Sequence, residues 1–151
     1  DMALHHLKDL RMAREFLVAG VRDIVALSPV AHRRQVDVQK GRAMVAAIAQ
    51  DHQSGRVLML AWMSPETLRE TLKSGYVCYW SRSRAALWRK GETSGHVQRL
   101  VDLRWDCDGD TLLLLVDQKG PACHTNRRSC FYNAVREGVT VSLTSPLASE
   151  V

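Results

Sequence analysis

Apolar side chains recur at helical spacing near the start of the chain, between residues 4 and 27. The apolar positions of this stretch, with charged residues between them, are Leu7, Leu10, Leu17, Val21 and Ile24. This period predicts an amphipathic helix. The next stretch, SPVAHRRQVDVQKGR, lacks such a period and indicates a linker or an irregular arm. We therefore expect a helical extension with its linker over residues 1–41 and a folded domain over residues 42–151.

The clearest helix signal in the folded domain is the stretch SPETLRETLKSG. Ser64 has the position of an N-cap, Pro65 that of the first helical residue and Glu66 that of the first turn, while Gly75 marks the end. The apolar run RVLMLAWM, which directly precedes it, has the length of a strand. These patterns predict a strand followed by a capped helix.

Two further stretches have the composition and period of strands. YVCYWSR is aromatic and β-prone, and HVQRLVDLRW alternates apolar with polar residues. Asp108 and Gly109 then separate this alternating stretch from the apolar run TLLLLV, which is a strong signal for a β-hairpin. The acidic and thiol side chains around residue 107 are therefore expected at the tip of a hairpin.

Length and composition fit a single globular domain. The chain has 151 residues, of which 46% are hydrophobic and 25% are charged, and no apolar run approaches the roughly 20 residues that span a bilayer. The start DMALHHLKDL lacks the pattern of a secretory signal, so we expect a cytoplasmic protein. The net charge of +5 favours an anionic partner, which leaves nucleic acid, a phosphorylated metabolite, an acidic protein or no specific partner open.

Acidic side chains alternate with a thiol in the stretch WDCDGD. If the strand stays extended through Asp108, then Cys107 points to one face and Asp106 to the other. Thiolates favour zinc and carboxylates favour magnesium, so we expect a zinc site at Cys107 and a magnesium site at Asp106, Asp108 and Asp110. The alternative for the aspartates is the chemistry of the hairpin turn itself.

Two more cysteines, Cys123 and Cys130, lie in the loop sequence GPACHTNRRSCF. The sequence has no C-x-x-C pair, which disfavours a structural zinc finger. Three thiolates with an open fourth position match a catalytic zinc instead. His124 is either a fourth ligand, a polar loop residue or, as we favour, a base for proton transfer. Cys78 stands apart in a predicted strand and is expected to be a buried free thiol.

Basic and hydroxyl side chains concentrate in the stretch SRSRAALWRKGETSGH. This is the composition of a loop that binds phosphate through Arg82, Arg84, Arg89 and Lys90, although a solvated basic strand end is an equal alternative. Trp88 could stack on a base or belong to the core.

The chain from about residue 42 to 132 resembles the phosphoribosyl-AMP cyclohydrolase family of histidine biosynthesis. The resemblance rests on LMLAWM, YWSRSRAALWRKGETSGHVQ, DCDGD and GPACHTNRRSCF, in that order. It implies an α+β, β-rich fold of small antiparallel sheets, with a metal-bearing hairpin and one or two helices, in an intertwined homodimer. It also implies zinc ligands at Cys107, Cys123 and Cys130, magnesium ligands at the three aspartates, and one zinc per subunit completed by both chains.

The reaction that the resemblance implies is hydrolysis of the bond between N1 and C6 of the adenine ring of phosphoribosyl-AMP. Zinc would generate the nucleophile, His124 would transfer a proton, and His96 is a second candidate for contacting the purine. Magnesium would help to hold phosphate. The expected substrate-binding residues are Ser81, Arg82, Ser83, Arg84, Trp88, Lys90, Thr93 and Ser94.

A rival hypothesis from a different class is a non-enzymatic zinc module that binds nucleic acid through its basic strands. It accounts for the charge and the thiols, but not for three thiolates without a fourth or for carboxylates where phosphate would approach. The resemblance therefore favours a small-molecule substrate, with neither nucleic acid nor membrane as partner. It also implies a single activity, since nothing after Tyr132 has the length of a second domain.

Overall fold

The computed structural model describes residues 44–107 and 110–148, so the predicted N-terminal helix and its linker lie outside the described residues. The described part holds one helix, α3, and eight strands. Their bounds are β1 (Val45–Asp51), β2 (Val57–Met63), α3 (Pro65–Ser74), β3 (Cys78–Ser81), β4 (Ala86–Arg89), β5 (Gln98–Trp105), β6 (Thr111–Gln118), β7 (Asn133–Arg136) and β8 (Val139–Ser142). No helix in this part is long and apolar enough to cross a membrane.

Six of the strands form one curled sheet in the order β4-β3-β2-β1-β6-β5. All neighbouring strands are antiparallel except β1 and β6, which are parallel with Ala46 opposite Thr111. The expected small antiparallel sheets are therefore only partly confirmed, because β1 joins the two antiparallel halves into a mixed sheet. β1 was not predicted: its sequence VAAIAQD is rich in alanine, which has little intrinsic preference for strands. Ala47 and Ala49 are nevertheless fully buried between its neighbours.

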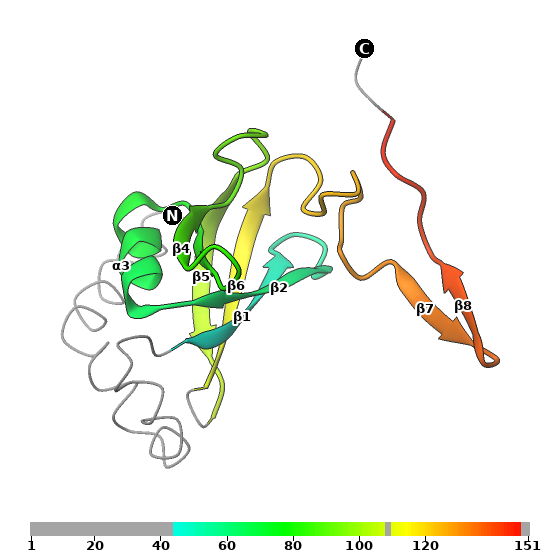
Figure 1. Cartoon of the computed structure of the whole chain (residues 1–151), viewed down its shortest axis with the longest axis horizontal. Coiled ribbons are helices and arrows are strands. Elements are labelled where there is room, and N and C mark those ends of the chain that lie inside the picture. Colours follow the sequence, from blue (N-terminus) through cyan, green and yellow to red (C-terminus); the bar gives the residue numbers. More distant parts are fainter. Residues whose placement is uncertain (1–43, 108–109, 149–151) are drawn as a thin grey trace, which may run out of the picture.

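The predicted helix is confirmed at both ends as α3. The Ser64 hydroxyl accepts a hydrogen bond from the Thr67 N–H at 3.2 Å, and the Thr67 hydroxyl accepts one from the Ser64 N–H at 2.9 Å. At the other end Gly75 has φ 78°, and its N–H donates to the Thr71 carbonyl. Thr71 also accepts a hydrogen bond from the Cys78 N–H at 2.9 Å. The helix is therefore anchored to β3, where it covers one side of the sheet (Figure 1).

A buried polar chain crosses the core between β3, β5 and β6. The Tyr79 hydroxyl donates to the side-chain oxygen Oε1 of Gln98 at 2.6 Å, and the side-chain Nε2 of Gln98 donates to Oε1 of Gln118 at 2.8 Å. Tyr79 and Gln98 have no exposed surface. Burial raises the pKa of Tyr79, so its phenol stays protonated and can act as the donor. Cys78 is also buried, as predicted, and burial raises the pKa of its thiol.

The predicted hairpin is confirmed in its strands, since β5 and β6 pair antiparallel with Trp105 opposite Leu112. β5 ends at Trp105, however, so the expected extended alternation through Asp108 is wrong. The Asp106 carboxylate accepts hydrogen bonds from the N–H groups of Asp110 and Thr111 at 3.0 and 3.2 Å. These local hydrogen bonds close a turn, and a turn does not alternate its side chains between two faces.

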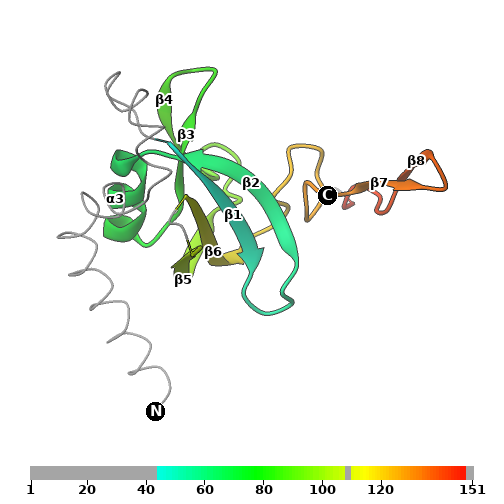
Figure 2. The same ribbon diagram turned by 90° about the horizontal axis from the view of Figure 1, so that it is seen from below.

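A second sheet, β7 and β8, forms a hairpin that projects from the body of the molecule (Figures 1 and 2). Its turn is made by Glu137 at φ 50° and Gly138 at φ 77°. Val135 and Val139 on these strands are 67% and 62% exposed. The sequence reading did not predict this hairpin.

Candidate functional site

The loop between β6 and β7, residues 119–132, brings Cys123 and Cys130 together and is called the cysteine loop below. The N–H groups of Ala122 and Cys123 donate to the carbonyls of Arg128 and Arg127 at 3.2 and 3.0 Å, which folds the loop back on itself. The Cys130 N–H donates to the Leu58 carbonyl at 2.7 Å and fixes the end of the loop to β2. As a result the two thiols lie within hydrogen-bonding distance of each other.

The two thiols of this pair differ in acidity. Burial opposes ionisation of Cys123, but hydrogen bonds from the hydroxyl and backbone of Thr125 and from Cys130 outweigh it and lower the Cys123 pKa. The Thr125 hydroxyl lies 3.0 Å from the Cys123 sulfur. Burial and the neighbouring Cys123 raise the pKa of Cys130 to about 11. Two neighbouring thiols of this kind form a donor set that a soft divalent cation can bind with release of protons.

Lys90 lies beside the same loop. Its Nζ donates to the Ala122 carbonyl at 2.9 Å, and it lies 5.7 Å from the centre of the Trp88 ring. Lys90 is 9% exposed, and burial lowers the pKa of its ammonium group while the Cys130 and Cys123 thiols oppose that shift. The structure therefore places this predicted phosphate ligand against the cysteine loop.

Cys107 is separated from this pair within one chain. It lies exposed in the turn before β6, whereas Cys123 lies in the loop after β6. The eight residues of β6 span roughly 25 Å at the usual rise of a strand. Among the described residues, no group of three or more His, Cys, Asp or Glu side chains is close enough to hold a metal ion. One chain thus brings together two of the three predicted zinc ligands.

Two of the three predicted magnesium ligands lie at the same hairpin tip as Cys107. The Asp110 carboxylate accepts a hydrogen bond from the Thr111 hydroxyl at 3.0 Å, and Asp106 holds the turn as described above. Asp108 lies outside the described residues. Asp106 and Asp110 therefore lie in one turn, which is compatible both with a carboxylate site and with the predicted turn chemistry.

The predicted phosphate loop is not one loop, because residues 86–89 form β4 within it. This is a correction: the stretch ALWR pairs with β3 in four residues, and strand pairing decides its conformation. The substrate-binding candidates therefore fall into two turns at opposite ends of β4. One turn holds Arg82, Ser83 and Arg84, directly after Ser81 at the end of β3, and the other holds Thr93 and Ser94.

The first turn is ordered by its own side chains. The Ser81 hydroxyl lies 3.4 Å from the Ser83 hydroxyl and accepts from the Arg84 Nε at 3.3 Å. The Arg82 guanidinium lies over the Trp62 ring at 4.6 Å. Trp88, by contrast, packs against the buried Tyr79 with ring centres 5.7 Å apart. This contact supports the core alternative for Trp88.

The second turn meets the cysteine loop through His96. The Gln118 amide donates to the His96 carbonyl at 3.3 Å, and the Lys119 N–H donates to the Val97 carbonyl at 3.0 Å. The His96 ring lies so close to Gly120 that a Cβ there would stand 2.7 Å from its Cδ2 atom. His124 is exposed on the cysteine loop itself. The structure therefore places His96 against Gly120 and Lys90 against Ala122, in the loop that also carries Cys123, His124 and Cys130.

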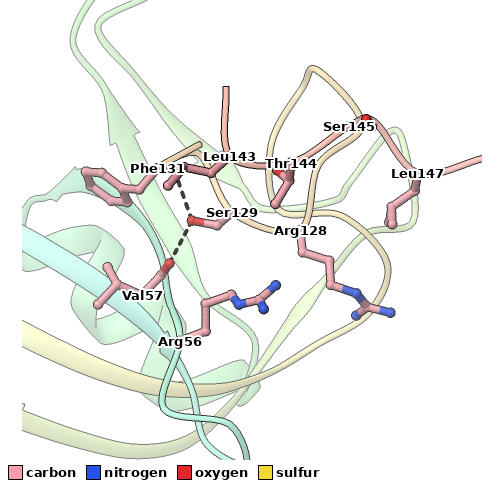
Figure 3. A pocket seen from close by; sticks show the side chains of 9 residues that line it. All are labelled: Arg56, Val57, Arg128, Ser129, Phe131, Leu143, Thr144, Ser145 and Leu147. Atoms are coloured by element: carbon pink, nitrogen blue, oxygen red, sulfur yellow. Dashed lines mark hydrogen bonds between the residues drawn. The ribbon is translucent and has the colours of Figure 1, made fainter. Parts of the chain in front are cut away.

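A pocket of about 290 Å³ opens between the end of the cysteine loop and the C-terminal segment (Figure 3). It is lined by Arg56, Val57, Arg128, Ser129, Phe131, Leu143, Thr144, Ser145 and Leu147. The Ser129 hydroxyl donates to the Val57 carbonyl at 2.7 Å and accepts from the Phe131 N–H at 3.0 Å. Sequence reasoning missed this pocket, because three distant segments form it and none of them has a local motif.

Comparisons with known proteins give a consistent result. The family model described as phosphoribosyl-AMP cyclohydrolase matches residues 59–132. A phosphoribosyl-AMP cyclohydrolase of Alkalilimnicola ehrlichii is 72% identical over 126 residues, which cover 83% of this chain and 82% of the relative. One of Paracoccus denitrificans is 69% identical over 103 residues, which cover 68% of this chain and 85% of the relative. A protein of Pseudomonas fluorescens called phosphoribosyl-AMP cyclohydrolase 2 is 66% identical over 104 residues, which cover 69% of this chain and 71% of the relative.

Proposed function

The chain belongs to the phosphoribosyl-AMP cyclohydrolase family, and we propose that it opens the adenine ring of phosphoribosyl-AMP by hydrolysis of the bond between N1 and C6. This reaction is a step of L-histidine biosynthesis. The observation that carries the proposal is the identity of 72% over 126 residues with a relative of that name. The four free cysteines suit a reducing compartment, and we place the enzyme in the cytoplasm.

Zinc is the metal that the cysteine pair fits best. Cys123 and Cys130 present two sulfur donors from one loop, and sulfur donors favour zinc over magnesium or calcium. Cys107 would supply the third thiolate. When bound, zinc would contribute the Lewis acidity that activates water for attack on C6 of the purine.

A homodimer would bring Cys107 to the cysteine pair. The length of β6 keeps Cys107 away from Cys123 of the same chain, so the third donor is expected from a second copy. Val135 and Val139 on the projecting hairpin offer apolar surface that such a pairing would bury. We propose one zinc per subunit, each site built from both chains.

Mixing two inactive variants tests the shared site. Cys107→Ala and Cys123→Ala should each lose zinc and turnover, because each removes a thiolate donor. After unfolding and refolding together, the mixture should recover about one quarter of wild-type activity, since half of the dimers are mixed and each mixed dimer holds one intact site. If a zinc-free Cys123→Ala protein stayed active, the zinc mechanism would be refuted. If Cys107→Ala and Cys123→Ala both stayed active, the proposed set of zinc ligands would be refuted.

The remaining residues are assigned by their positions around the cysteine loop. His124, exposed beside Cys123, is proposed to transfer the proton, and His96 is proposed to contact the purine. The hydroxyl, arginine and threonine side chains of the two turns that flank β4 would bind the phosphate-bearing ribose ends. Magnesium, held by the aspartates of the hairpin tip, would assist with phosphate.

Turnover of phosphoribosyl-AMP by the purified chain is the direct test. The wild-type protein should hydrolyse it, and His124→Asn should lower the rate and alter the pH-rate profile, because the variant lacks the imidazole that is proposed to take up and release the proton. An unchanged rate and profile would remove His124 from the chemistry. Tight, salt-dependent binding of mixed-sequence RNA or DNA without any turnover would contradict the enzyme and favour the nucleic-acid module.

A further inference from the structure

Lys90 is held in a fixed position below the cysteine loop. It follows β4 directly, and its N–H donates to the Val77 carbonyl at 3.1 Å. Its side chain runs past the Trp88 ring to the Ala122 carbonyl, one residue before Cys123. These contacts fix both ends of a flexible side chain, so the ammonium group is held in one place.

A buried ammonium group is unfavourable unless negative charge lies nearby. In residues 44–107 and 110–148, the ion pairs of Arg89 with Glu70, Arg99 with Asp117 and Arg104 with Asp102 do not include Lys90. The Lys90 ammonium group donates instead to the Ala122 carbonyl at 2.9 Å, which belongs to the residue directly before Cys123. The buried ammonium group is therefore held beside the backbone of the cysteine loop, with a neutral carbonyl as its hydrogen-bond acceptor.

The charge of the proposed zinc site explains why a lysine would be placed here. Zinc with three thiolates leaves one negative charge in a partly buried setting. One ammonium ion held against the cysteine loop would balance that charge. Groups that do not bind a metal directly but hold or neutralise its ligands contribute strongly to metal affinity.

We infer that Lys90 is a positioning residue for the zinc ligands, in which a buried ammonium ion neutralises thiolate charge and strengthens zinc binding. This inference rests on the proposed function and deepens it. It assigns Lys90 a role different from the predicted contact with substrate phosphate. The Ala122 carbonyl is the acceptor that holds the ammonium group beside the residue before Cys123.

Three substitutions separate charge from hydrogen bonding. Lys90→Arg keeps the charge and a donor, Lys90→Gln keeps a donor for the Ala122 carbonyl but removes the charge, and Lys90→Met removes both. Lys73→Gln, an exposed position in the last turn of α3, is the matched control for the loss of one lysine charge. Zinc affinity of each full-length protein is measured with Zn²⁺ against a chromophoric chelator. Far-ultraviolet circular dichroism and thermal unfolding check the fold.

The inference predicts that Lys90→Gln and Lys90→Met bind zinc about 10- to 100-fold more weakly than wild type. Lys90→Arg and Lys73→Gln should stay within about threefold of wild type, on the same measure of affinity. Wild-type affinity in Lys90→Gln would overturn the inference, since the hydrogen bond alone would then account for Lys90. If Lys90→Met does not fold, the zinc affinities of Lys90→Gln and Lys90→Arg still show whether the charge of Lys90 matters.

Turnover of phosphoribosyl-AMP by the wild-type protein is recorded separately. Zinc binding and turnover in wild type with unchanged affinity in Lys90→Gln would refute the role of Lys90 and leave the proposed function intact. A wild-type protein that turns over substrate but binds no zinc would refute the zinc site and the role of Lys90 together. Absent turnover with a charge-dependent zinc affinity would refute the proposed reaction and support the role of Lys90.

Discussion

Replacing Gly120 with alanine tests the contact between the second turn and the cysteine loop. Gly120 has φ 67°, and a Cβ at this position would lie 2.7 Å from Cδ2 and 3.1 Å from Nε2 of His96. Carbon atoms in favourable contact are about 3.5 Å apart or more, so the imidazole must move by roughly 0.8 Å to make room. The Gly120→Ala protein is therefore expected to carry a displaced His96.

Two effects of Gly120→Ala can be estimated from this geometry. The left-handed backbone costs an alanine about 1–2 kcal/mol of folding free energy, and the displaced ring adds to that cost. If His96 contacts the purine, a misplacement approaching 1 Å is expected to reduce kcat/KM by as much as about 100-fold. Urea unfolding measures the first effect, and initial rates with phosphoribosyl-AMP measure the second.

Gly75→Ala is the matched control for the backbone effect. Gly75 has φ 78°, and no heavy atom lies within 4 Å of the position of its Cβ. It should lose a similar free energy of unfolding from backbone strain while it keeps its kcat/KM. If Gly120→Ala behaves in the same way as Gly75→Ala in both measurements, the close contact with His96 has no functional consequence and the reasoning is wrong.

Three further predictions concern stability. Gln98→Leu removes the acceptor of the buried Tyr79 hydroxyl and should lower the unfolding free energy by about 1–3 kcal/mol; a double variant with Tyr79→Phe should lose less than the two separate losses combined. Ser64→Ala removes the N-cap of α3 and should cost about 1 kcal/mol, measured by thermal unfolding. Hydrogen bonds from the hydroxyl and N–H of Ser54 lower the pKa of Asp51. A lowered pKa in the folded state stabilises the fold at pH values above the ordinary carboxyl pKa of about 3.9. This stabilisation is lost as the pH falls through the pKa of the folded state. Ser54→Ala should therefore lower the free energy of unfolding by less than about 1 kcal/mol at pH 7 and by still less at low pH, both measured by urea unfolding. An equal loss at both pH values would contradict this account.

Local signals predicted the elements whose stability is local. The helix α3 was placed because its cap and stop are chemical features of Ser64, Pro65 and Gly75. The β5–β6 hairpin was placed because alternation and a turn signal coincide. β1 and β4 were missed because their residues have weak or ambiguous strand preference, and pairing with neighbours decides their conformation.

The sequence by itself determined the family, the capped helix and the central hairpin, and it predicted which side chains carry the chemistry. These follow from local spacing and from motifs that are contiguous in the chain. The tertiary structure alone decided that Cys123 and Cys130 form a pair, that Lys90 is buried beside them and that His96 meets Gly120. Each of these contacts joins segments that are far apart in the chain or fold back through a loop. Their geometry is set by how the strands pair in the sheet, which a local pattern does not encode.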